Sequence, residues 1–131
     1  MTLHPLAKRS LVLGTAILGL GVLIGAFGAH GLKNIVEADK LVTFETGVRY
    51  HFYHGFGLIT VGILQQMFQD LKLQVPHWAF FAGILLFSFN CYFYVLTGIK
   101  VFAMIVPLGG VMFVLGWFVL SSKIWGCRSR S

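Results

Sequence analysis

The stretch LVLGTAILGLGVLIGAFGA, residues 11–29, carries no charged side chain and is long enough to cross a lipid bilayer. A membrane-spanning helix needs about 20 mostly apolar residues, because the hydrocarbon core is about 30 Å thick. Three further uncharged runs follow at residues 52–68, 78–96 and 101–120. Within hydrocarbon the backbone must satisfy its own hydrogen bonds, which leaves helices or closed barrels. The runs are continuously apolar rather than alternating, and they therefore predict helices.

The composition of the whole chain is that of an integral membrane protein. Of its 131 residues 57% are hydrophobic and only 11% are charged, and the mean hydropathy is +0.84. Soluble domains carry about 25% charged residues. We expect one all-α transmembrane domain over residues 1–131, an up-down-up-down four-helix bundle. Its spans are expected at about residues 10–30, 43–68, 77–97 and 101–122, with the first retained as a span rather than cleaved as a signal peptide.

The net charge of +6 is interpreted as a signal for orientation and not as a sign of nucleic-acid binding. Basic residues flank membrane spans, and their excess marks the cytoplasmic side. With four spans, the side that holds both termini also holds Lys8, Arg9, Lys72, Lys123, Arg128 and Arg130. The other side holds Lys33, Lys40, Lys100 and Arg49. This distribution predicts that both termini are cytoplasmic.

Glycines in the first and last spans predict close helix packing. Gly21 and Gly25 form a GxxxG pair, and Gly14, Gly21 and Gly28 repeat every seven residues. Lipid tails give no hydrophobic drive between helices, so association depends on small residues that allow close approach. The glycines expected to pack helices are Gly14, Gly21, Gly25, Gly28, Gly109 and Gly110. We expect contacts within the bundle, and an interface with a second copy or another membrane protein is the alternative.

Polar side chains gather toward one end of the expected spans. They are His30, Glu45, Arg49, His51, His54 and Asn90. On the expected topology this polar cluster lies in the outer half of the membrane, where ionisable groups are costly and usually point into the bundle. Packing and hydrogen bonds between helices are the first interpretation. A site for a proton, a metal or a cofactor is the alternative.

No motif assigns a catalytic residue or a cofactor. His30, His51 and His54 could hold a metal ion only by converging, and their spacing matches no specific metal signature. The sequence contains no nucleophile elbow, P-loop or dinucleotide fingerprint. We therefore assign no catalytic residue, no metal and no cofactor.

Two segments carry a resemblance to a known family. Residues 25–32, GAFGAHGL, and residues 44–54, FETGVRYHFYH, resemble a family of small bacterial membrane proteins. The family is catalogued as domain of unknown function 423 and includes transmembrane protein 256. Residues 107–110, PLGG, are similar to its last span, whereas Phe89 and Asn90 depart from its usual third span. The resemblance implies a four-span protein of the bacterial inner membrane with no assigned activity.

These observations favour a non-enzymatic accessory or scaffold subunit. It would contact membrane lipid, and a second copy or a membrane-protein partner, but no nucleic acid. The alternative is the handling of protons, metal ions or small solutes through a histidine-containing cavity in the outer half of the membrane. An enzyme ranks third, because no pair of nucleophile and base can be named.

Overall fold

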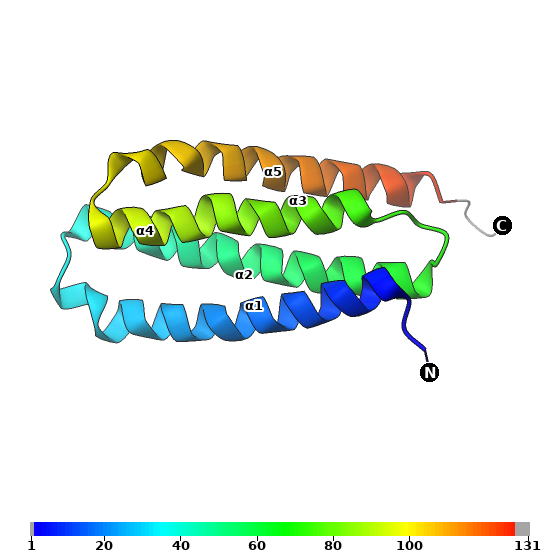
Figure 1. Cartoon of the computed structure of the whole chain (residues 1–131), viewed down its shortest axis with the longest axis horizontal. Coiled ribbons are helices and arrows are strands. Elements are labelled where there is room, and N and C mark those ends of the chain that lie inside the picture. Colours follow the sequence, from blue (N-terminus) through cyan, green and yellow to red (C-terminus); the bar gives the residue numbers. More distant parts are fainter. Residues whose placement is uncertain (1, 128–131) are drawn as a thin grey trace.

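The computed structural model describes residues 2–127, and helices make up most of them (Figure 1). In chain order the elements are α1 (Pro5–His30), the 3₁₀ turn η1 (Leu32–Asn34), α2 (Ala38–Met67), α3 (Gln74–Ile84), the π-helical turn η2 (Leu85–Phe89), α4 (Asn90–Thr97) and α5 (Lys100–Trp125). The segments α3, η2 and α4 follow one another without a break and form one rod. Residues 2–127 contain no strand. The all-α class expected from the sequence is confirmed.

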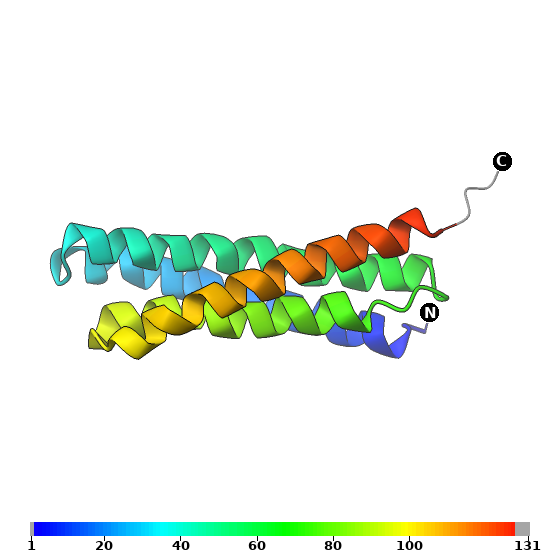
Figure 2. The ribbon, with the colours of Figure 1, turned by 90° about the horizontal axis from the view of Figure 1, so that it is seen from above.

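The helical rods lie side by side and reverse direction from one to the next (Figure 1). Helix α1 packs along α2, and α2 also packs on the rod of α3, η2 and α4. Helix α5 packs on that same rod, which it crosses obliquely in Figure 2. The start of α1 and the end of α5 lie at the same end of the molecule.

Three helical stretches are long and apolar enough to cross a membrane. They are Pro5–Asn34, Gln74–Thr97 and Lys100–Trp125. These correspond to the first, third and fourth of the expected spans. Helix α2 is long enough but falls short in hydropathy, because its first part is charged and the part that follows, although uncharged, contains His51, His54, Gln65 and Gln66. The expected second span, residues 43–68, is therefore not among the stretches that qualify by length and composition.

The third expected span is not a uniform α-helix. Residues Leu85–Phe89 are π-helical, and the side-chain amide of Asn90 donates a hydrogen bond to the carbonyl of Leu85 at 2.9 Å. A π turn widens the helix by one residue and leaves its carbonyls in altered positions. The rod ends at Gly98, whose φ of 71° lies in the left-handed region that glycine adopts without strain. This glycine turns the chain directly into α5.

Four of the six glycines singled out from the sequence pack tightly against a neighbouring helix of the same chain. A Cβ atom at Gly14 would lie 3.0 Å from the carbonyl oxygen of Gly55, and one at Gly21 would lie 3.2 Å from Cδ2 of His51. Gly28 faces the Phe44 ring, and Gly109 faces the backbone of η2.

The other two glycines have more room. A Cβ at Gly25 would meet only Val48, at 3.5 Å, and one at Gly110 would meet only Phe87, at 4.0 Å. The glycines of α1 and α5 thus bring helices of one chain together, and Gly110 leaves space beside α5.

Candidate functional site

Buried histidines connect the helices of this protein. His51, His54 and His77 are 0%, 3% and 1% exposed. Each of them forms a hydrogen bond to a different helix from its own. A buried polar group must be hydrogen-bonded to avoid a penalty of several kcal/mol, so these partners decide what the histidines can do.

His51 joins α2 to both α1 and α4. Its Nε2 atom lies 2.7 Å from the carbonyl oxygen of Ile17, and its Nδ1 atom lies 3.0 Å from the hydroxyl of Tyr92. A carbonyl only accepts, so Nε2 carries the proton and donates it, while Nδ1 accepts from the Tyr92 O–H. Burial disfavours the doubly protonated, charged ring, so the imidazole is neutral and in the Nε2–H form. Gly21 permits this contact, because it leaves the surface of α1 open where the ring approaches.

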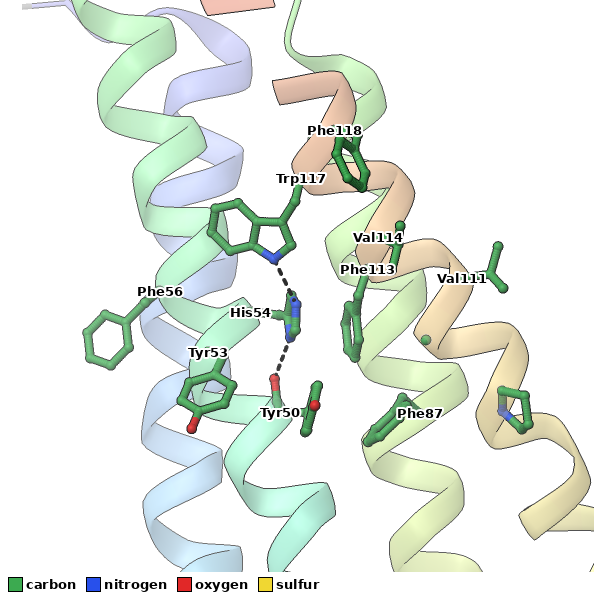
Figure 3. A pocket seen from close by; sticks show the side chains of 12 residues that line it. Tyr50, Tyr53, His54, Phe56, Phe87, Val111, Phe113, Val114, Trp117 and Phe118 are labelled. Carbon is green, nitrogen blue, oxygen red and sulfur yellow. Dashed lines mark hydrogen bonds between the residues drawn. The ribbon is translucent and has the colours of Figure 1, made fainter. Parts of the chain in front are cut away.

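His54 joins α2 to α5 (Figure 3). Its Nδ1 atom lies 2.7 Å from the carbonyl oxygen of Tyr50, and its Nε2 atom lies 3.1 Å from Nε1 of Trp117. The indole N–H can only donate, so Nε2 accepts and Nδ1 donates to the carbonyl. His54 is therefore neutral and in the opposite tautomer from His51. Its ring stacks on Phe113 with 3.4 Å between the ring centroids.

A third histidine joins α3 to α1 at the other end of the bundle. His77 Nδ1 lies 2.8 Å from the hydroxyl oxygen of Ser10, and both side chains are buried. Neither residue was singled out from the sequence. A usable signal existed, because Ser10 opens the first span and His77 opens the third. Two antiparallel crossings return the chain to the same side of the membrane, which places these positions at one depth.

The six polar residues expected to form one cluster occupy separate environments. His30, Glu45 and Arg49 are exposed, whereas His51 and His54 are buried between helices. Asn90 is buried and bonds within its own rod. The six residues therefore do not line one shared cavity, because α-helical geometry turns these side chains toward different neighbours.

His30, His51 and His54 do not converge. Within residues 2–127, no three His, Cys, Asp or Glu side chains come close enough to share a metal ion. Both ring nitrogens of His51 and of His54 are already engaged with protein partners.

An apolar groove of about 1000 Å³ lies beside His54, between α2 and α5. Tyr50, Tyr53 and Phe56 line it from α2, and residues of α5 from Pro107 to Phe118 line the other wall (Figure 3). Phe87 of η2 contributes as well. No charged side chain lines this groove. His54 is the only histidine that lines this groove.

Long apolar helices joined by neutral, buried imidazoles define a helical integral membrane protein. The chain belongs to the family described as "Protein of unknown function (DUF423)", which matches residues 24–110. The resemblance stated from residues 25–32 and 44–54 is thus confirmed.

Curated relatives agree with this assignment. The UPF0382 membrane protein YwdK of Bacillus subtilis is 39% identical over 114 residues, which cover 86% of this chain and 93% of that protein. A UPF0382 membrane protein of Staphylococcus saprophyticus is 38% identical over 113 residues, with the same shares covered. No solved structure matches the chain. The protein is therefore a membrane protein of a family whose function is not established.

Proposed function

We propose that this chain is a non-enzymatic accessory or scaffold protein that crosses the bacterial inner membrane four times, with both termini in the cytoplasm. The observation that carries the proposal is the hydrogen bonding of His51 and His54. All of their ring nitrogens bond to protein atoms, and three of these bonds reach another helix. The most reactive side chains in the bundle are thereby used to hold helices together.

Helix α2 supplies the fourth crossing in this proposal. Its 30 residues extend about 45 Å, which exceeds the roughly 30 Å of hydrocarbon. Its buried histidines have partners inside the protein, so they do not face lipid. Glu45 and Arg49 are exposed in the half of the helix that would face the periplasm, and the long Arg49 side chain can extend toward that interface.

Charge supports the orientation. The molecular end that holds the start of α1 and the end of α5 carries Lys8, Arg9, Lys72 and Lys123. Arg128 and Arg130 lie outside the described residues and add to the same side by sequence. The positive-inside rule assigns the side with more basic residues to the cytoplasm.

The same geometry gives less support to a route for protons or solutes. A relay needs a chain of groups that can each accept a proton and pass it on. The proton on His51 Nε2 points at the Ile17 carbonyl, and the proton on His54 Nδ1 points at the Tyr50 carbonyl. Both carbonyls are ordinary backbone acceptors within helices, so each hydrogen bond is a structural end point.

Proton flux in reconstituted liposomes tests this choice. We expect the wild-type protein to pass protons no faster than protein-free liposomes, and we expect the same of His51→Gln and His54→Gln. Both variants should instead lower stability in a detergent-unfolding assay, because each loses part of a connection between helices. Flux that exceeds the background and disappears in His54→Gln would refute the structural role.

Cross-linking in native membranes tests the accessory role. A Cβ atom at Gly19 of α1 would have nothing within 4 Å, whereas Gly14 on the same helix is packed against Ile59 and Gly55. A photoreactive group attached at Gly19→Cys should capture a protein neighbour, and one at Gly14→Cys should not. If photoreactive groups at outward positions of α1 and α5 captured no other protein, that result would contradict the accessory role.

A further inference from the structure

Helices α2 and α5 face each other along a line that we call the seam. The seam stays open along much of its length. The two helices meet where Phe113 and Trp117 reach His54. A second groove of about 660 Å³, toward Trp125, shares Trp117 with the first groove of about 1000 Å³. Pockets for small molecules measure about 300–1,000 Å³, so this seam has room for a large ligand.

The lining of the two grooves restricts what can occupy them. None of the lining residues is charged. A metal ion, a charged solute or the phosphate of a lipid headgroup would lose its hydration there without gaining a counter-charge. The part of the occupant that lies in the seam is therefore neutral and largely apolar.

Two hydroxyl groups indicate a polar feature in that occupant. Tyr50 and Tyr53 are 36% and 53% exposed on the groove side of α2. In Figure 3 neither hydroxyl has a hydrogen bond to another groove residue. Each exposed O–H can donate to an occupant of the groove, and a carbonyl oxygen on the ligand would accept that hydrogen bond.

The length of the seam exceeds one leaflet of the bilayer. From Pro107 to Trp125, α5 rises about 27 Å at about 1.5 Å per residue. One leaflet contributes about 15 Å of hydrocarbon, half of the core thickness. An acyl chain that hangs from a headgroup at one surface covers only part of this distance. A single occupant of the whole seam must therefore be longer than one acyl chain.

The rims of the groove do not suit a transmembrane helix. Helices in membranes approach one another through small residues. Here Tyr53, Phe56 and Phe118 stand at the rims, and Phe56 and Phe118 are 58% and 73% exposed. The small residue Gly110 also lines the groove, and a Cβ atom there would meet only Phe87. A thin flexible chain can lie between such rims.

We propose that the seam between α2 and α5 binds an isoprenoid quinone, a neutral ring with carbonyl acceptors on a chain longer than one leaflet. The ring lies beside Tyr50 and Tyr53, whose hydroxyls donate to its carbonyls, and the aromatic wall provides stacking partners. The chain passes Trp117 toward Trp125. This inference rests on the proposed crossing of the membrane by α2, which an independent labelling experiment tests.

Photolabelling with a decaprenyl azidobenzoquinone tests the binding. The protein is placed in nanodiscs of phosphatidylethanolamine and phosphatidylglycerol, and labelled peptides are located by mass spectrometry. We expect labels on α2 near Tyr53 and on the facing part of α5, with competition by an unlabelled prenylquinone. An excess of phosphatidylglycerol should not compete.

Two matched variants make the test specific. Gly110→Leu fills the groove where a Cβ meets only Phe87 at 4.0 Å, and Gly19→Leu adds the same side chain to the open face of α1. We expect about 10-fold weaker labelling for Gly110→Leu, equivalent to about 1.4 kcal/mol, and no change for Gly19→Leu. The double variant Tyr50→Phe/Tyr53→Phe removes only two oxygen atoms and should weaken labelling about fivefold.

Three results would overturn the proposal. The first is wild-type labelling in both Gly110→Leu and Tyr50→Phe/Tyr53→Phe. The second is equal competition by phosphatidylglycerol, which would make the seam an ordinary lipid contact. The third is labelling confined to the outer face of α1. Each can occur while proton flux and membrane topology match the proposed function, so the two proposals fail separately.

Discussion

At the scale of single residues, His54 shows how an imidazole can lie deep in an apolar bundle without a charge. Its two nitrogens face one obligate acceptor and one obligate donor, the Tyr50 carbonyl and the Trp117 indole. A second proton on the ring would point at the indole N–H and break that bond. The surroundings therefore fix both the neutral form and the tautomer.

The bond between His54 and Trp117 should show a measurable coupling energy. Trp117→Phe keeps an aromatic ring but leaves Nε2 of His54 without a donor, and His54→Phe removes the acceptor. Hydrogen bonds between membrane helices contribute about 0.6 kcal/mol on average and at most about 1.7 kcal/mol. We expect a double-mutant cycle in detergent unfolding to give a coupling within this range. Fully additive effects would show that the contact does not stabilise the fold.

The two tautomers can be observed directly. Nitrogen NMR of the protein in nanodiscs at neutral pH should show His51 protonated at Nε2 and His54 protonated at Nδ1. His54→Gln identifies the second set of signals by removing it. If either ring carried two protons, or if both shared one tautomer, the assigned hydrogen bonds would be wrong.

The sequence placed His51 and His54 in the second span but could not supply their partners. The partner of His51 in α1 is the backbone carbonyl of Ile17, and a backbone carbonyl leaves no mark in residue type. Trp117 lies 63 residues from His54, and only the oblique crossing of α5 brings it near. Such contacts follow from tertiary packing.

At the scale of helices, Gly109 and Gly110 of α5 look equivalent in the sequence but have different surroundings in the structure. Gly109 and Gly110 are adjacent, but only Gly109 packs against the backbone of the rod that α5 crosses. A Cβ atom at Gly109 would lie 2.8 Å from the backbone carbonyl carbon of Leu86. Backbone atoms cannot rotate away as a side chain can.

Alanine at these two positions should therefore give opposite results. Gly109→Ala should destabilise the protein by about 1–3 kcal/mol, the usual penalty for overpacking, because α5 must move away from η2. Gly110→Ala should be neutral or stabilise the helix by up to about 1 kcal/mol. Detergent unfolding of the two variants measures the difference. Equal destabilisation would argue against this contact.

The third span shows where sequence patterns stop being informative. Residues 77–97 form an almost continuous apolar run, so the helix was predictable, and its end at Gly98 followed from the Thr97–Gly98 pair. The π turn at Leu85–Phe89 was not predictable, because an apolar run has no polar face whose periodicity could shift. Asn90 follows this turn, and its side-chain amide donates to the carbonyl of Leu85, the first residue of the turn.

At the scale of the whole molecule, the proposed four-span topology depends on α2. Hydropathy counts each histidine and charge of this helix as though it faced lipid, and by that count only three stretches within residues 2–127 qualify as spans. The structure buries His51 and His54 between helices, where their partners offset the loss of water. The loop near Lys40 and the loop near Lys72 adjoin the two ends of α2 and lie at opposite ends of the molecule (Figure 1).

Cysteine labelling at the two ends of α2 is the decisive test of this topology. In a background with Cys91→Ala and Cys127→Ser, the variants Lys40→Cys and Lys72→Cys are treated with a membrane-impermeant maleimide before and after the membrane is permeabilised. We predict that Lys40→Cys reacts from the periplasm and that Lys72→Cys reacts only after permeabilisation. Labelling of both positions from the same side would show that α2 does not cross the membrane, and the four-span topology would be wrong.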